Sequence, residues 1–210
     1  MSGGAGISGG GKVIANAAMS LDGFIADTDD QVGPLFDWYG NGTIKVTGTD
    51  PARVFSISAA TASYVLPIWE NIGAMVVGRR LFDLIDGWNG IPPFGEAIFV
   101  VTHRVPQEWV KAHPLAHFTF VTDGIASAIA RAKAFAGDRH VALAAGNLTG
   151  QAIAAGLVDE ISVALAPAVF GTGRRFFGDY EGNPVLLDDP VVVKGDRVTH
   201  LHYRIRKEAH

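Results

Sequence analysis

Cysteine is absent from the 210 residues of this chain. Disulfide bonds and thiolate metal sites are therefore excluded, and nothing in the sequence requires an oxidising compartment. Long apolar runs are missing too, since no stretch reaches the roughly 20 residues that a membrane-spanning helix needs. The N-terminus is rich in glycine and serine and lacks the basic-then-apolar order of a secretory signal, so we expect a soluble cytoplasmic protein.

Positive charge is also scarce. The chain has 17 lysines and arginines against 21 aspartates and glutamates, which gives a formal net charge of −4. Because no basic stripe is available to displace the counterions of a nucleic acid, we expect no nucleic-acid partner. Hydrophobic residues make up 48% of the chain and charged residues 18%, which is typical of a globular protein with a well-covered sheet.

The length fits one large domain that can bury a core without covalent cross-links. Residues 1–11 are glycine-rich, and they read as a flexible lead-in, an expression scar or a loop that lies close against other backbone. Residues 12–210 show no internal repeat and no evident linker. We expect them to form a single domain.

Several apolar runs lack alternating polar positions, which indicates strands buried on both faces. Helix patterns separate most of these runs, and Gly195-Asp196 joins the last two in a hairpin signature. This order predicts an α/β fold with a mostly parallel central sheet, flanking helices and a C-terminal antiparallel hairpin. The expected strands are 12–19, 74–77, 97–102, 118–122, a run beginning at 141, 160–167, 185–194 and 198–206.

Capping residues locate two of the helices. Ser58 is expected to cap a helix that runs towards Ile72, although Pro67 should kink it or end it early. Asp123 is the expected cap of a later helix, which Gly137 should stop.

The stretch from Val141 to Gln151 places an apolar strand, a small-residue turn and a helix start in succession. Asn147 and Thr149 are candidate caps of that helix. Free amides and the helix dipole would make this turn an anion site. The alternative is a strand-to-helix connection with nothing bound.

Ligands of open α/β sheets bind beyond the carboxyl ends of the strands. Three such ends are chemically suited to this, namely Gly78-Arg79-Arg80, Thr102-His103-Arg104 and Ala144 to Asn147. Two arginine-bearing turns and one amide-rich turn on the same rim suit a ligand with several phosphates. For Arg80 and Arg175 the alternative is a solvated surface charge. Neither the dinucleotide fingerprint nor a P-loop is present.

Other polar residues have plainer interpretations. Asp22, just before Gly23, is read as a turn former whose carboxylate bonds local amides. His200 and His202 alternate on one strand face, but without a third ligand we expect exposed strand histidines and no metal site.

The motifs as an ordered set resemble the dihydrofolate reductase-like family that includes the reductase domain of bacterial riboflavin biosynthesis. The resemblance covers about residues 12–206. It is carried by Met19-Ser20-Leu21-Asp22-Gly23-Phe24-Ile25-Ala26, Val77-Gly78-Arg79-Arg80, Val101-Thr102-His103-Arg104, and Gly156-Leu157-Val158-Asp159-Glu160 through Pro167 to Gly171-x-Gly173.

The resemblance implies NADPH binding along the strand ends and hydride transfer from the nicotinamide to a small heterocycle, pterin- or pyrimidine-like. It also implies pairing of two chains, and apolar strand residues such as Val191 and Val192 add to the expectation of a homodimer. The implied cofactor-binding residues are Ala18 and Ile25 beside the nicotinamide, Arg79, Thr102, His103 and Arg104 around the adenosine phosphate, and Ala145, Gly146, Asn147 and Leu148 at the pyrophosphate, together with Gly78 and Arg80.

Three departures from the family pattern keep a second hypothesis open. Ala144-Ala145 stands where the family usually has two glycines, often with a cis bond, and Leu81 replaces a hydroxyl residue. The acid that anchors a pteridine has no clear match, and Asp37 is the nearest candidate. The alternative is therefore a nucleotide- or flavin-binding protein that keeps the fold without turnover; a scaffold without any ligand is a third reading.

The connection from Asp27 to Pro51 carries Phe36, Trp38 and Tyr39, whose flat faces could stack on a heterocycle. Asp37 lies among them and is the candidate catalytic acid. The alternative is that the aromatic residues seal this loop onto the core while Asp37 faces water.

Overall fold

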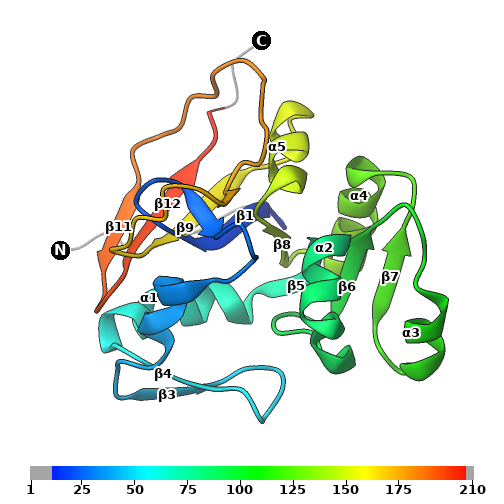
Figure 1. Ribbon diagram of the computed structural model, residues 1–210, viewed down its shortest axis with the longest axis horizontal. Coiled ribbons are helices and arrows are strands. Elements are labelled where there is room, and N and C mark those ends of the chain that lie inside the picture. The colour runs from blue at the N-terminus through cyan, green and yellow to red at the C-terminus, as the bar shows by residue number, and fades with distance from the viewer. Residues whose placement is uncertain (1–10, 207–210) are drawn as a thin grey trace.

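The computed structural model describes residues 11–206, and its centre is an eight-stranded sheet (Figure 1). Of the lead-in expected at residues 1–11, all but Gly11 lies outside the described residues. The strands, in the order in which they lie side by side, are β11 (Val191–Lys194), β12 (Thr199–Arg204), β9 (Glu160–Leu165), β1 (Val13–Met19), β8 (His140–Ala144), β5 (Ile72–Gly78), β6 (Ala97–Val101) and β7 (Phe118–Val121).

The strands from β9 to β7 are all parallel to one another, and β12 and β11 extend the sheet in antiparallel pairing. Burial explains the parallel part. In β5 every residue before Gly78 is buried, so this strand must be covered on both faces. The expected mostly parallel sheet with a C-terminal antiparallel hairpin is confirmed.

Helices cover both faces of the sheet. On one face α4 (Ile125–Ala136) packs Ile129 and Ala132 into the core formed with β5, β6 and β8. On the other face lie α1 (Ala59–Glu70) and α2 (Arg79–Leu84). The remaining elements are α3 (Gln107–Ala112), α5 (Asn147–Ala154), the 3₁₀ segments η1 (Gly33–Tyr39) and η2 (Asp86–Gly90), and two small pairs, β2 (Phe24–Ala26) with β10 (Arg174–Arg175) and β3 (Ile44–Thr47) with β4 (Val54–Ile57). Within residues 11–206 no helix has the length and apolar character that crossing a membrane requires.

The cap of α1 is as expected, because the Ser58 hydroxyl accepts the Thr61 amide at 3.3 Å. Pro67 does not end the helix early, since α1 continues to Glu70. Only the last turn follows the proline, and packing of Trp69 against Phe94, with ring centroids 4.9 Å apart, stabilises that turn.

The cap of α4 differs from the expectation. Gly124, with φ 95°, is the N-cap residue and no side chain caps the helix. Asp123 lies one position too early, and its carboxylate instead contacts Arg131 at 3.2 Å. Gly137 ends the helix as expected, with φ 63°.

The connection expected over residues 27–51 contains regular structure, namely η1 and β3. Its aromatic side chains point into the protein. Trp38 is 4% exposed and lies 4.2 Å from Tyr39 between ring centroids, while Tyr39 packs on Phe55 at 4.4 Å. These contacts attach the segment to the core beside α1, which is the sealing role considered from the sequence.

Candidate active site

A cavity of about 900 Å³ lies where β5, β6 and β8 end. Gly78, Val101 and Ala144, the last residues of these strands, are in its wall, so the three turns expected on one rim do meet. Of the residues assigned from the sequence to a cofactor, those that line this cavity are Ile25, Gly78, Arg79, Arg80, Thr102, His103, Arg104, Ala145, Gly146, Asn147 and Leu148.

Arg79 is fixed on the cavity wall by one neighbour in α2 and one in the turn after β6. Its Nε donates to Asp83 at 2.7 Å and its Nη1 to the Arg104 carbonyl at 2.7 Å. The guanidinium also lies 5.9 Å from the centroid of the Phe82 ring. Arg79 therefore ties the start of α2 to the turn after β6.

The turn after β6 is held by the buried Thr102. Its hydroxyl donates to the Arg104 carbonyl at 2.9 Å and accepts the Arg104 amide at 3.2 Å. The side chain of Arg104 is exposed, and within the described residues its guanidinium has no hydrogen-bond or ion-pair partner. Thr102 thus serves the turn, and Arg104 keeps its donors for a ligand.

The turn after β8 leads into α5 through Gly146, whose φ of 107° favours glycine. Neither Asn147 nor Thr149 caps the helix, contrary to expectation. The Thr149 hydroxyl bonds the Ala144 carbonyl at 3.1 Å, and the Asn147 side chain accepts the Asp179 amide at 3.3 Å. Asn147 and Leu148, the first two residues of α5, line the cavity, and within residues 11–206 their backbone amides have no hydrogen-bond partner.

Asp30 bridges two arginines at the rim of the cavity. It receives two hydrogen bonds from Arg80, one from Nε at 2.9 Å and one from Nη2, and a third from Arg174 Nε at 2.9 Å. The hydrogen bonds from Arg80, and then the one from Arg174, lower the pKa of Asp30 to about 2. Arg80 is therefore an ion-paired rim residue rather than an isolated surface charge.

Gly173 explains how Arg174 and Arg175 reach the cavity. A Cβ at Gly173 would lie 2.1 Å from the Ala26 carbonyl oxygen, so only glycine allows β10 to lie this close to β2. Arg174 and Arg175 follow and line the cavity together with Arg79, Arg80 and Arg104. Neither Asp30 nor Arg174 was expected at this site from the sequence, and Arg175 was considered there only against the alternative of a solvated surface charge.

Comparison with known proteins adds a family to this geometry. The sequence model of the RibD C-terminal domain family matches residues 11–199. The chain belongs to the RibD C-terminal domain family. A comparison with curated proteins gives no match.

Solved structures with the same fold include proteins of riboflavin biosynthesis. A riboflavin biosynthesis protein from Shewanella sp. PV-4 is 22% identical, with a TM-score of 0.66 over 93% of this chain and 99% of that one. A diaminohydroxyphosphoribosylaminopyrimidine deaminase/5-amino-6-(5-phosphoribosylamino)uracil reductase from Thermotoga maritima is 15% identical, with a TM-score of 0.56 over 94% of this chain and 57% of that one. Dihydrofolate reductase from Enterococcus faecalis, complexed with NADP(H), is 13% identical, with a TM-score of 0.56 over 93% and 97% of the two chains. The dihydrofolate reductase-like fold is confirmed.

Two residues assigned from the sequence do not line the cavity of this RibD C-terminal domain. Ala18 is 4% exposed and packs against Leu35 and Ala166. Asp37 is exposed in η1, where its carboxylate lies 3.4 Å from Arg197. The structure therefore does not bring the candidate acid to the cavity.

The remaining polar residues also differ from their sequence interpretations. His200 is 2% exposed and His202 is partly buried, so neither is an exposed strand histidine. Asp22 does form hydrogen bonds to amides, but these belong to the distant Phe170 and Gly171, at 3.1 and 2.7 Å. The described residues contain no group of histidine and acidic side chains that could hold a metal ion. They contain no cis peptide bond, so Ala144-Ala145 is trans.

Proposed function

We propose that this chain is an NADPH-dependent reductase that transfers a hydride to a small pterin- or pyrimidine-like heterocycle. The observation that carries this function is the convergence of five arginines and the start of α5 on one cavity at the carboxyl ends of the strands. NADPH, when bound, supplies the hydride. The cavity volume of about 900 Å³ is at the upper end of the range for small-molecule sites, which suits a dinucleotide.

The residues present fit the phosphates of such a cofactor. The unpaired guanidinium of Arg104 and the first amides of α5 are donors that prefer anionic oxygens. Arg79 is already held by Asp83 and the Arg104 carbonyl, so it can add charge without first being ordered. Ile25 lies on the same wall and offers an apolar surface to a nicotinamide ring.

A binding protein without turnover is the second candidate. The absence of Asp37 from the cavity favours it, because an acid near the reacting atoms is one usual source of the proton that follows a hydride. The two candidates differ in one measurable property. A reductase oxidises NADPH when an acceptor is added, whereas a binding protein shows saturation alone.

The test begins with NADPH titrated against the chain while tryptophan fluorescence is followed. A dissociation constant for NADPH below about 1 mM is expected of a metabolic cofactor site. NADPH absorbance is then followed with dihydrofolate and with 5-amino-6-(5-phosphoribosylamino)uracil as acceptors. Arg131→Ala, on the exposed face of α4, is the matched control for arginine removal. Absence of saturable NADPH binding would refute the reductase, and binding without acceptor-dependent oxidation would leave the binding protein.

A further inference from the structure

A short segment of the chain is bound to two walls of the cavity through one carboxylate. This segment, residues 27–32 and here called the strap, joins β2 to η1, and its Asp30 and Val32 line the cavity. Asp30 accepts two hydrogen bonds from Arg80 of α2 and one from Arg174 of β10. β10 pairs with β2 on the side of the strap, whereas α2 begins where β5 ends. The ion pair between Asp30 and Arg80 therefore joins two different walls.

The strap is held in shape by its own hydrogen bonds. The Asp27 carboxylate accepts the amides of Asp29 and Gln31, at 2.8 and 2.9 Å, and the Asp27 amide donates to the Gln31 carbonyl at 3.0 Å. Asp30 lies within this turn with φ 63°, a conformation that aspartate tolerates better than most residues. The strap therefore presents Asp30 to Arg80 without first having to be ordered.

The two arginines hold Asp30 differently. The Asp30 side chain is 9% exposed, and its pKa of about 2 keeps it ionised at any pH near neutrality. Arg174 also donates from Nη2 to the Thr28 carbonyl at 3.4 Å, so it contacts the strap at two points. Arg80 donates two N–H groups in a fork, but its side chain is 62% exposed. Because water competes for an exposed ion pair, the contact with Arg80 can open while Arg174 keeps its hold on the strap.

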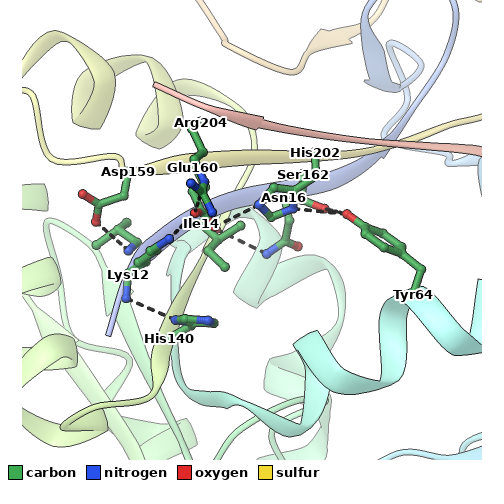
Figure 2. Close-up of polar contacts among 11 residues, drawn as sticks. Lys12, Ile14, Asn16, Tyr64, His140, Asp159, Glu160, Ser162, His202 and Arg204 are labelled. Carbon is green, nitrogen blue, oxygen red and sulfur yellow. Dashed lines mark hydrogen bonds and ion pairs between the residues drawn. The ribbon is translucent and has the colours of Figure 1, made fainter. Parts of the chain in front are cut away.

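A second carboxylate with several cationic partners lies elsewhere in the fold. Glu160 is 2% exposed and lies among Lys12, His202 and Arg204 (Figure 2). Burial alone would raise the pKa of Glu160, but the hydrogen bonds from His202 and Lys12 outweigh it and lower that pKa to about 2. Glu160 is the first residue of β9 and is not among the residues that line the cavity. Asp30 is the one of these two carboxylates that a ligand in the cavity would meet.

The proposed ligand has to pass the ion pair of Asp30 with Arg80. A Cβ at Gly146 would lie 3.9 Å from Ile25 Cδ1, so Ile25 is beside the turn after β8, whereas Arg104 follows β6. In the sheet β5 lies between β8 and β6, and α2 with Arg80 begins at the end of β5. A dinucleotide that extends from Ile25 to Arg104 therefore crosses the place where the strap is tied to α2.

We infer that Asp30 and Arg80 form a clasp that opens to admit and to release the dinucleotide, a role that rests on the proposed function. The closed clasp joins the strap to α2 over the cavity. When it opens, the strap stays with Arg174 and the cavity becomes accessible between the strap and α2. Because Asp30 and Arg80 bond each other, closing slows entry and exit by the same factor. The clasp therefore sets how long NADPH stays bound and leaves its equilibrium affinity unchanged.

The test compares Asp30→Asn with Asp29→Asn, which removes the same charge from the next position of the strap. Asp29 is exposed, does not line the cavity, and within residues 11–206 its carboxylate has no hydrogen-bond or ion-pair partner. Association of NADPH is followed by stopped-flow tryptophan fluorescence, and dissociation by the fluorescence of NADPH as excess NADP⁺ replaces it. Relative to Asp29→Asn, the Asp30→Asn variant should raise both rate constants about fivefold, the upper end for an exposed ion pair, with Kd unchanged.

Arg80→Met tests the other half of the clasp, with Arg131→Ala as the control for the loss of one positive charge. It should raise both rate constants to a similar extent. The double variant Asp30→Asn/Arg80→Met should be no faster than either single variant, because each of them already removes the same ion pair. Melting temperatures of all variants are recorded alongside.

Rate constants of Asp30→Asn that equal those of Asp29→Asn would overturn the clasp. A lower Kd in Asp30→Asn together with a higher Kd in Arg80→Met would also overturn it, since Arg80 would then be a phosphate ligand for which Asp30 competes. A lower melting temperature with unchanged rate constants would mean that the ion pair serves folding alone. Failure of the wild-type chain to bind NADPH would instead refute the proposed function, and the role of the clasp with it.

Discussion

Replacing Arg104 by alanine gives the sharpest test of cofactor recognition. Its guanidinium lies on the cavity wall without a partner in residues 11–206, so its removal leaves no protein group unpaired. The turn itself is held by Thr102 through the Arg104 backbone, which alanine retains. The change therefore removes one charge and little else.

The expected magnitude follows from the exposure of this side chain. A charge-assisted hydrogen bond contributes about 1.5–3 kcal/mol, which corresponds to roughly ten- to a hundredfold in affinity. Because Arg104 is exposed and solvent screens its charge, we expect the lower end, about a tenfold loss of NADPH affinity. NADH lacks the additional phosphate on the adenosine ribose, so its affinity should change far less.

Arg79→Ala provides a useful comparison, because Arg79 joins two turns of the cavity. Its loss should weaken NADPH more than NADH, but it should also weaken both by loosening the turn. Dissociation constants are measured by tryptophan fluorescence at one fixed ionic strength, with Arg131→Ala as control. Equal losses for NADPH and NADH in Arg104→Ala would refute the assignment of Arg104 to the phosphate.

Four further results are expected. Because the pKa of Glu160 is lowered, its contribution to the free energy of unfolding is complete above pH 4.5 and is lost as pH falls towards 2. Denaturant melts should show that the free energy of unfolding falls by about 3 kcal/mol over that range, and by less in Glu160→Gln. Gly173→Ala should lower the melting temperature more than Gly171→Ala, because only the Gly173 Cβ would meet backbone; equal shifts would contradict the close contact of β10 with β2. Asp37→Asn should keep turnover near that of the wild type, since Asp37 lies outside the cavity, and a hundredfold loss of kcat would restore it as the catalytic acid. Light scattering should show a dimer, because β11 is an edge strand that exposes two valines to solvent. A particle of 22.2 kDa at micromolar concentration would exclude the dimer.

The fold was largely predictable because its strands follow a simple rule. β5 is apolar throughout, β1 and β8 are apolar apart from Asn16 and His140, and only a sheet covered on both faces can bury such runs. The hairpin of β11 and β12 was predictable from Gly195-Asp196. Helix caps were harder to predict, because glycine took the cap positions of α4 and α5 and neighbouring polar side chains had other partners.

The cavity was predictable only where a turn directly follows a strand. Arg79 and Arg104 stand next to strand ends, so sequence order alone places them on one rim. Asp30 and Arg174 meet across 144 residues of chain, and no local pattern indicates such a contact. Asp37 was chosen because aromatic residues surround it, but those residues pack inward and leave its carboxylate exposed.

The alternation of side chains along β9 has a consequence for how this chain can vary. Ile161 and Val163 belong to the core on the α4 side, whereas Glu160 and Ser162 face α1. An inserted or deleted residue at the start of β9 would exchange the two sets, so that a carboxylate and a hydroxyl would enter the apolar core while valine would face Tyr64. Changes of length in homologous chains should therefore be confined to the connections on either side of β9. A point substitution within β9 affects either the packing of the apolar core or the polar side chains that face α1, but not both.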